Sequence, residues 1–354
     1  MVGSAVCLLF ILVLMTACAA SKLPGTEITQ TALPLVSSSP TTQATLTSSP
    51  SPTATPIPWA TLIKTPAHTP IPNPVDLVSV PDLKATYLLL GSDRRANETF
   101  FKTDAIVLVF LRTDGNISMV SIPRNTMVYI PGHEVFYINW TWYSAVLAHE
   151  DPFKLMADTL QYNFGVRPVG YAMIEFGHFI TLIDELGGID VMVSKDFYHS
   201  EIDVDSPVAH MVHAGLVHMD GETALWYSRA RISLNDDINR GCRQQEVISA
   251  LYTRAVENLK ISDLATYWHM FNGLLQTNLS LADSESGFLT VKKPPEIGSY
   301  SMRSAVTEWW EPETSTYFLV PDPEKVRELL LVAASNSRQV EPGLVSTQEV
   351  SPCK

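Results

Sequence analysis

A change of composition near residue 80 constrains the fold more than any other feature of this chain. From residue 21 to about residue 74 the sequence is mostly Ser, Thr, Pro and Ala, with 11 of the 24 prolines and only Lys22, Glu27 and Lys64 as charged side chains. Such a segment cannot bury enough apolar surface to fold. We therefore predict a Ser/Thr/Pro-rich stalk over residues 21–80, one folded domain over residues 81–335, and a flexible tail over residues 336–354.

The first twenty residues predict export. Residues 5–17 are apolar, which suits a signal peptide but is short for a membrane span of about 20 residues. The run from Met15 to Cys18 is similar to a bacterial lipobox, so we predict a signal peptide or lipoprotein anchor over residues 1–20 with lipidation at Cys18. No Lys or Arg precedes the apolar run, and an uncleaved signal anchor is therefore the alternative. In both cases we expect an extracytoplasmic protein that is anchored to a membrane.

The folded part alternates between strand and helix patterns. Apolar runs predict strands at residues 86–90, 105–111, 117–122, 189–193 and 317–320. Asp151 and Pro152 predict the start of a helix that Gly165 ends, and further helices are predicted at residues 179–186, 243–259 and 323–334. The predicted fold is α/β (α+β), with a mixed central β-sheet flanked by helices.

Four of the 13 arginines lie within fifteen residues: Arg229, Arg231, Arg240 and Arg243. The chain has a net charge of −13, so a broad basic surface for nucleic acid is not expected. Guanidinium groups match phosphate geometry, and the cluster therefore favours a small localised anion such as a pyrophosphate. The alternative is a set of solvated arginines that pair with nearby carboxylates. The segment alone leaves both interpretations open.

Two carboxylates occupy neighbouring strand ends. Asp93 follows the first predicted strand and Asp104 directly precedes the second. Together they could hold a hard cation such as Mg²⁺, completed by water and phosphate oxygens. The alternative is that both are turn or capping residues. Arg124 follows the third predicted strand and could reach the same space.

Six short motifs occur in a shared order. They are Leu88-Leu-Leu-Gly-Ser-Asp93, Lys102-Thr-Asp104, Ser121-Ile-Pro-Arg124, Leu186-Gly-Gly-Ile-Asp-Val191, Leu216-Val-His-Met-Asp-Gly-Glu-Thr-Ala-Leu225, and Arg229-x-Arg231 followed by Asp237-x-x-Arg240-x-x-Arg243-Gln-Gln245. In this order they resemble the LytR-CpsA-Psr family over residues 83 to about 260.

The resemblance implies an activity and a set of partners. Members of the family transfer cell-wall glycopolymers from a polyprenyl-pyrophosphate carrier to peptidoglycan, outside the membrane and with Mg²⁺. The expected partners are thus a polyprenyl-pyrophosphate-linked glycan, a peptidoglycan or other wall acceptor, and the membrane, with no nucleic acid. The alternatives are a diverged, non-catalytic polyprenyl-phosphate-binding protein and a polyprenyl-pyrophosphate hydrolase.

The resemblance also assigns roles to residues. Asp93 and Asp104 would hold Mg²⁺, and Arg124, Arg229 and Arg231 would grip the phosphate oxygens. The residues expected to border the same pocket are Lys102, Asp237, Arg240, Arg243 and Gln244. Either Asp93 or Asp237 could accept the proton of the attacking hydroxyl.

Four positions in three motifs depart from the family pattern. Lys102 and Thr103 precede Asp104 where an Arg-Ser pair is usual, Asn125 replaces an aspartate, and Tyr137 replaces a lysine. The last change removes a cation from the expected phosphate pocket, so reduced activity is consistent with the sequence. A disulfide between Cys242 and Cys353 is compatible with export, although no feature of the sequence requires it.

Overall fold

The computed structural model describes residues 71–95, 100–199, 210–231, 236–258, 273–280, 297–312 and 316–335. The predicted anchor with Cys18, the stalk up to residue 70 and the predicted tail lie outside these ranges. None of the helices within them combines the length and the apolar character that crossing a membrane requires.

A six-stranded mixed sheet forms the centre of the domain, with the strand order β11-β6-β1-β2-β3-β12. Its strands are β1 (Leu83–Ser92), β2 (Thr103–Arg112), β3 (Ile117–Ser121), β6 (Gly170–Glu175), β11 (Leu275–Thr277) and β12 (Ile297–Ser301). β1, β2 and β3 pair antiparallel, whereas β6 joins β1 and β12 joins β3 in parallel. The predicted fold class, a mixed sheet flanked by helices, is confirmed.

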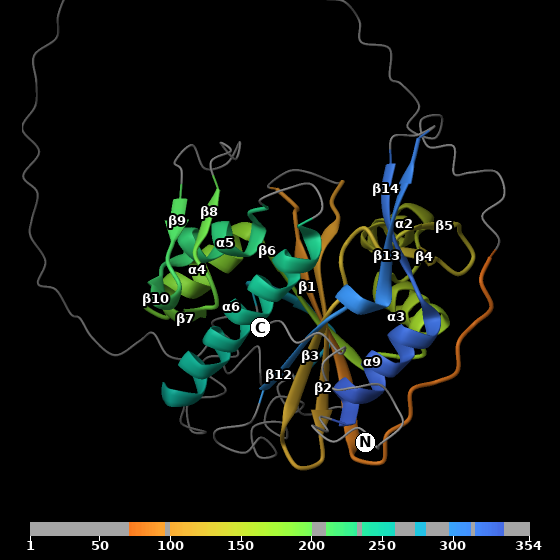
Figure 1. Ribbon diagram of the computed structural model, residues 1–354, viewed down its shortest axis with the longest axis horizontal. Coiled ribbons are helices and arrows are strands. Elements are labelled where there is room, and N and C mark those ends of the chain that lie inside the picture. Colours follow the sequence, from red (N-terminus) through yellow and green to blue (C-terminus); the bar gives the residue numbers. More distant parts are fainter. Residues whose placement is uncertain are drawn as a thin grey trace, which may run out of the picture. The chain divides into compact units, whose positions relative to one another are not determined.

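Helices cover both faces of this sheet (Figure 1). One face carries α4 (Phe176–Glu185), α5 (Gly221–Arg229) and α6 (Asp237–Asn258), and the other carries α2 (Thr141–Ala148), α3 (Pro152–Phe164) and α9 (Pro323–Ser335). Because both faces are buried, the central strands are apolar at nearly every position.

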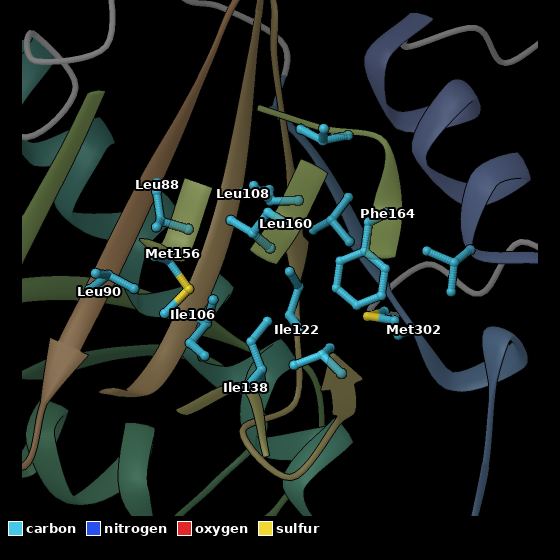
Figure 2. Close-up of a cluster of buried hydrophobic side chains, with 14 of the residues drawn as sticks. Leu88, Leu90, Ile106, Leu108, Ile122, Ile138, Met156, Leu160, Phe164 and Met302 are labelled. Carbon is cyan, nitrogen blue, oxygen red and sulfur yellow. The ribbon is translucent and has the colours of Figure 1, made fainter. Parts of the chain in front are cut away.

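Successive residues of one strand belong to two different cores. Tyr87 and Leu89 of β1 pack with the α4–α6 layer, while Leu88 and Leu90 pack with the α2–α3–α9 layer. This division follows from the alternation of side chains along a strand. Figure 2 shows the second core, in which residues of β1 and β2 meet those of α3, including Phe164.

The helix α3 begins and ends as the sequence predicts. Asp151 accepts hydrogen bonds from the backbone N–H groups of Phe153 and Lys154, and Gly165 adopts a left-handed conformation with φ 69°. A Cβ at Gly165 would lie 2.1 Å from the carbonyl oxygen of Asp76, so only glycine fits this close approach.

The same contact shows that the residues just before 81 belong to the folded part. The N–H of Val78 donates to the carbonyl of Gly165 at 2.8 Å, and the N–H of Val75 donates to that of Tyr162 at 3.0 Å. Val78 and Val80 also pack against the α3 core. These contacts extend the packed part of the described chain back to Val75, and the predicted domain start at residue 81 stays a prediction.

Smaller elements complete the described fold. They are β4 (Met127–Tyr129), β5 (Val135–Tyr137), the 3-10 helix η2 (Ile138–Trp140), β7 (Ile189–Val193), β8 (Phe197–His199), β9 (His210–Val212), β10 (Gly215–Met219), the 3-10 helix η4 (Arg303–Ala305), β13 (Val306–Glu311) and β14 (Thr316–Pro321). β7 matches its predicted bounds, whereas α6 begins six residues before its predicted start at Arg243.

Candidate functional site

One edge of the central sheet gathers the predicted site residues. The C-terminal ends of β1, β3, β6 and β12 lie at this edge, next to the start of β2. Asp93 follows β1, Asp104 is the second residue of β2, and Arg124 lies three residues after β3. Loops at the carboxyl ends of strands are the usual place for ligands in layered α/β folds.

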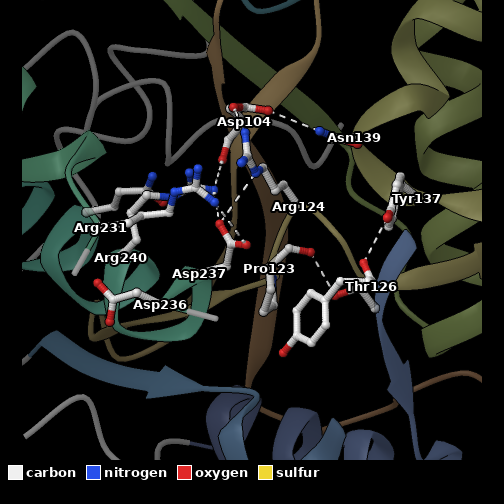
Figure 3. Close-up of polar contacts among 12 residues, drawn as sticks. Asp104, Pro123, Arg124, Thr126, Tyr137, Asn139, Arg231, Asp236, Asp237 and Arg240 are labelled. Atoms are coloured by element: carbon white, nitrogen blue, oxygen red, sulfur yellow. Dashed lines mark hydrogen bonds and ion pairs between the residues drawn. The ribbon is translucent and has the colours of Figure 1, made fainter. Parts of the chain in front are cut away.

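Asp104 lies at the centre of the site (Figure 3). Its Oδ2 forms an ion pair with Nη1 of Arg124, and its Oδ1 accepts a hydrogen bond from Nδ2 of Asn139 at 3.0 Å. Burial alone would raise the pKa of Asp104, but Arg124, Arg240 and the Asn139 hydrogen bond outweigh that effect and hold the pKa below its ordinary value. Asp104 is thus a fixed, ionised carboxylate.

Asp237 draws three arginines together. Its Oδ1 lies 2.8 Å from Nη2 of Arg240 and 3.4 Å from Nε of Arg124, and its Oδ2 lies 3.9 Å from Nη1 of Arg231. The Asp237 side chain is only 5% exposed. Burial would lower the pKa of Arg124, yet Asp104 and Asp237 outweigh it and raise that pKa, so Arg124 stays charged.

Arg240 is the most deeply buried of these three cations. Its side chain is 7% exposed, and Nη2 also donates to the backbone carbonyl of Asp104 at 3.3 Å. Burial, with the nearby charges of Arg124 and Arg231, lowers the pKa of Arg240 to about 10 despite the opposing effect of Asp237 and Asp104. Its Nε is buried and has no hydrogen-bond partner in the described part of the chain. An anion that accepts hydrogen bonds from these guanidinium groups would stabilise the charged form of Arg240 and could give its Nε a partner.

Asp93 is the second carboxylate of the predicted metal pair. Its Oδ1 accepts from the backbone N–H of Lys102 at 2.5 Å. Burial raises the pKa of Asp93, and the charge of Asp104 adds to this, while the Lys102 hydrogen bond opposes it. Because Gly91 pairs with Ala105 and Ser92 pairs with Thr103, the two carboxylates lie at the same end of β1 and β2.

These two carboxylates suit Mg²⁺, which commonly takes one or two carboxylates and completes its shell with water and substrate phosphates. Within the described ranges no group of three or more His, Cys, Asp or Glu side chains forms a metal cage.

The other two residues predicted to bind phosphate, Arg229 and Arg231, lie at the end of α5 and just after it. Arg231 contacts Asp237, as described above. Arg229 lies in the last turn of α5, with its guanidinium 4.2 Å from the ring centroid of Phe176, which begins α4. That stacking orients a charged group near the edge of the sheet.

Arg243 and Gln244 contact backbone carbonyls at the end of α5. Arg243 donates through Nε to the carbonyl of Tyr227 at 3.0 Å and through Nη2 to the carbonyl of Ala230, and its Nη2 lies 3.0 Å from Oδ2 of Asp236. Gln244 donates to the carbonyl of Ser228 at 3.3 Å. Both side chains tie α6 to the end of α5, and the prediction that they border the ligand pocket stays a prediction.

The start of α6 is held tightly against β3. A Cβ at Gly241 would lie 2.8 Å from the Cβ of Ser121, whose hydroxyl donates to the carbonyl of Gly241 at 2.9 Å. Gln245 donates to Oγ of Ser121 at 2.8 Å and to the carbonyl of Tyr300 at 2.7 Å. This packing brings Arg240 to Asp104. Cys242, which follows Gly241 in α6, is disulfide-bonded. Cys353, the partner suggested by the sequence, lies outside the described residues.

A group of aromatic side chains was not assigned to the site from the sequence. We use the name aromatic flank for Phe100, Trp140 and Tyr143 together with Lys102. The ammonium of Lys102 lies 4.7 Å from the ring centroid of Trp140 and 5.3 Å from that of Phe100. Lys102 therefore directs its charge to these rings.

The two changed motif positions also have defined surroundings. Tyr137 donates its hydroxyl to the carbonyl of Tyr317 at 2.8 Å, and burial raises the pKa of Tyr137 to about 12, so it is neutral at physiological pH. Asn125 is buried, and its Oδ1 has no hydrogen-bond partner in the described ranges. Asn139, whose amide donates to Asp104, was not among the site residues predicted from the sequence.

Comparisons with known proteins agree on one family. The family model described as the LytR_cpsA_psr family matches residues 68–327. The polyisoprenyl-teichoic acid–peptidoglycan teichoic acid transferase TagT of Bacillus subtilis is 34% identical over 206 residues, which are 56% of this chain and 61% of TagT. The probable cell wall biosynthesis protein LcpB of Corynebacterium glutamicum is 30% identical over 155 residues, 44% of this chain and 34% of LcpB. The chain thus spans less than two thirds of the length of either relative.

Solved structures show the same fold. B. subtilis TagV superimposes with a TM-score of 0.56 at 24% identity, covering 71% of this chain and 97% of TagV. The structure of TagT bound to LIIa-WTA superimposes with a TM-score of 0.55 at 24% identity, covering 76% of this chain and all of that one (100%). At these identities the likeness establishes the architecture alone.

Proposed function

This chain belongs to the LytR-CpsA-Psr family, and from that premise we propose that it is an extracytoplasmic, Mg²⁺-dependent glycopolymer phosphotransferase. The donor is a glycan on a polyprenyl-pyrophosphate carrier, and the acceptor is a sugar hydroxyl of a peptidoglycan-type polymer. The observation that carries the proposal is the partly buried cluster of Arg124, Arg231 and Arg240 around Asp104 and Asp237. The name of its relative TagT describes a transfer of this kind.

The proposed reaction is a phosphoryl transfer without change of oxidation state. The acceptor oxygen forms a bond to the phosphorus that carries the glycan, and the bond from that phosphorus to the bridging oxygen breaks. The electron pair of the broken bond leaves with polyprenyl phosphate, and the acceptor hydroxyl loses its proton to a base. The products are a phosphodiester between glycan and acceptor, and free polyprenyl phosphate.

The arginines stabilise the charge that develops on the phosphate oxygens. Guanidinium groups donate in a planar fork that matches phosphate geometry, and they act more strongly where water is excluded. Asp237 keeps Arg124, Arg231 and Arg240 close together before the substrate arrives. The site therefore needs little rearrangement when the pyrophosphate binds.

Asp93 and Asp104 would hold the Mg²⁺. When bound, the ion neutralises charge on the pyrophosphate and helps to orient it. Asp104 has the further task of fixing Arg124 and Asn139 on its two sides. Of the two candidate bases, Asp93 is the better placed, because the oxygens of Asp237 already contact three guanidinium groups.

Two observations favour a second candidate function, that of a polyprenyl-phosphate-binding protein without turnover. Tyr137 supplies a neutral hydroxyl where the family has a lysine, and Asn125 supplies an amide where the family has a carboxylate. A third candidate, hydrolysis of the carrier, needs only that water replaces the acceptor hydroxyl.

Turnover of a polyprenyl-pyrophosphate oligosaccharide by the full chain in detergent tests the proposal. We expect Mg²⁺-dependent release of polyprenyl phosphate that rises when a soluble peptidoglycan fragment is added and stops with EDTA. Asp104→Ala should lower the rate by at least about 100-fold. Arg167→Ala, which removes an arginine that binds Asp158 and Gln161 on the surface, is the matched control and should not change it.

Two results would overturn the transferase assignment. Tight binding of the donor without release would identify a carrier-lipid-binding protein. Release at the same rate with and without acceptor, with all phosphate recovered as hydrolysis products, would identify a hydrolase.

A further inference from the structure

The aromatic flank lies beside the proposed catalytic carboxylates without being part of the cationic cluster. We propose that Phe100, Trp140 and Tyr143 bind the pyranose ring of the acceptor, with the ammonium of Lys102 on the same surface. The inference rests on the proposed function and deepens it, since it assigns a binding site to the second substrate of the reaction.

The three rings form one compact surface group. The ring centroids of Phe100 and Tyr143 are 4.7 Å apart and those of Phe100 and Trp140 are 5.6 Å apart, both in edge-to-face geometry. The Trp140 and Tyr143 centroids are 6.2 Å apart, also edge to face. Edge-to-face packing leaves ring faces available for a further apolar surface.

The core covers this group only in part, with Trp140 packed on the buried ring of Phe136 at a centroid distance of 5.5 Å. Phe100 is 43% exposed, and Trp140 and Tyr143 are only partly buried. By contrast Trp142, two residues further along, is 1% exposed and packs on Tyr171 in the α3 core. The same short segment thus provides one fully buried tryptophan, Trp142, and one partly exposed tryptophan, Trp140, which packs on the edge of the same core.

One backbone and one side-chain hydrogen bond connect the aromatic flank and its neighbour Asn139 to the two carboxylates. Lys102 donates its backbone N–H to Asp93 at 2.5 Å, and Asn139, which precedes Trp140, donates to Asp104 at 3.0 Å. A ligand on these rings would therefore place its hydroxyl groups close to the proposed Mg²⁺ position and to Asp93.

A sugar ring is the ligand class that this surface fits. One face of a pyranose presents C–H groups, which pack on aromatic rings, while its hydroxyls need polar partners at the rim. Lys102 provides a cationic partner, since its ammonium lies over two of the rings and is tied to the site through its own backbone. A flat apolar ligand without hydroxyls would leave that ammonium without a polar contact.

The position relative to Asp104 assigns the surface to the acceptor. Arg231 and Arg240 lie on one side of Asp104, and Asn139 lies on the other (Figure 3). In phosphoryl transfer the attacking and leaving oxygens are roughly in line on opposite sides of the phosphorus. With the leaving polyprenyl phosphate on the arginine side, the attacking sugar hydroxyl comes from the side of Asn139 and Trp140.

Steady-state kinetics on Phe100→Ala and Trp140→Leu in the full chain test this assignment. We expect the KM for a soluble peptidoglycan fragment to rise about tenfold in each variant, while the KM for the donor changes less than twofold. The control is Trp310→Leu, which removes a tryptophan that is 53% exposed on β13 and should leave both KM values unchanged. Thermal melting of each variant separates a binding defect from loss of the fold.

A direct titration separates this inference from the proposed function. Binding of an N-acetylglucosamine tetramer, followed by tryptophan fluorescence, should be weakened about tenfold in Phe100→Ala even if the wild-type chain shows no turnover. An unchanged acceptor KM and an unchanged tetramer affinity in both variants would overturn the inference. A rise in the donor KM alone would place the donor glycan, and not the acceptor, on this surface.

Discussion

The two sides of Asp104 are built in opposite ways. On one side, which we call the cationic flank, Arg124, Arg231 and Arg240 converge on the buried carboxylate of Asp237. On the other side, Asn139 leads into the aromatic flank, where partly exposed rings surround Lys102. One side offers fixed positive charge, and the other offers ring faces with a single ammonium.

The difference shows how one carboxylate can serve two kinds of ligand. Buried guanidinium groups with fixed partners favour a compact anion whose oxygens are placed within narrow limits. Aromatic faces accept many orientations of a ring and bind through area. A phosphate therefore suits the first side, a glycan suits the second, and Asp104 contacts residues that belong to each.

Removal of the Asp237 carboxylate should have the largest effect. In Asp237→Asn three guanidinium groups lose their shared counterion, and we expect the free energy of unfolding to fall by about 3–5 kcal/mol in urea denaturation. Inorganic pyrophosphate should raise the melting temperature of the variant more than that of the wild type, because the anion compensates the same charges.

The control for that experiment is Asp158→Asn, which removes a surface carboxylate that pairs with Lys154 and Arg167. Its unfolding free energy should change by about 1 kcal/mol or less. If pyrophosphate stabilised neither Asp237→Asn nor the wild type, the cationic flank would not be an anion site.

Arg124→Gln should have the next largest effect. The variant loses ion pairs to both Asp104 and Asp237, and with them a donor to the phosphate. We expect kcat for release of polyprenyl phosphate to fall about 100-fold, while the KM for the acceptor fragment changes little. Arg167→Gln serves as the surface control, and a fall of less than threefold in Arg124→Gln would contradict a role in stabilising developing charge.

Tyr137→Lys should have the smallest effect and the opposite sign. The charges of Arg124 and Asp237 both affect the pKa of the Tyr137 hydroxyl, so a lysine there adds a cation close to the anion site. We expect a prenyl diphosphate to bind about threefold more tightly. Tyr137→Phe, which removes the hydroxyl without adding charge, should show no gain in affinity. Equal affinities of Tyr137→Lys and Tyr137→Phe for the prenyl diphosphate would show that this position does not act on the phosphate.

Local sequence signals were sufficient for β1, β2 and β3 and for one carboxylate pair, whereas β6, β11 and β12 were not predicted. The capping residues of α3, Asp151 and Gly165, and the alternation of β7 act over a few residues, so the sequence predicts those elements closely. Asp93 and Asp104 flank two strands that pair directly with each other, and that pairing places them together.

The start of α6 was predicted wrongly because its first turns carry buried charged residues. Asp237 and Arg240 occupy buried positions in these turns. Because both residues are charged, they do not contribute to the apolar periodicity that predicts a helix. The helix was therefore predicted to begin at Arg243, where the apolar positions start.

Two adjacent carboxylates at the start of α6, Asp236 and Asp237, pair with different arginines, and the sequence spacing does not show which pair lies in the site. Asp237 pairs with Arg240 in the site, whereas Asp236 pairs with Arg243 beneath it. The carbonyls of Tyr227 and Ala230, at the end of α5, accept hydrogen bonds from Arg243. The position of this segment therefore decides which arginine is held there and which lies next to Asp104. That position depends on the tertiary packing of α5 against α6.

The most direct test of the account is the affinity of the full chain for a prenyl diphosphate compared with the matching prenyl monophosphate, measured by calorimetry with Mg²⁺. We predict that the diphosphate binds at least about tenfold more tightly, since each added ionic contact of about 1.4 kcal/mol changes affinity tenfold. This preference should disappear in Arg231→Gln and persist in Arg167→Gln. Equal affinity of the wild type for the two lipids would contradict the claim that the cationic flank is built for a pyrophosphate.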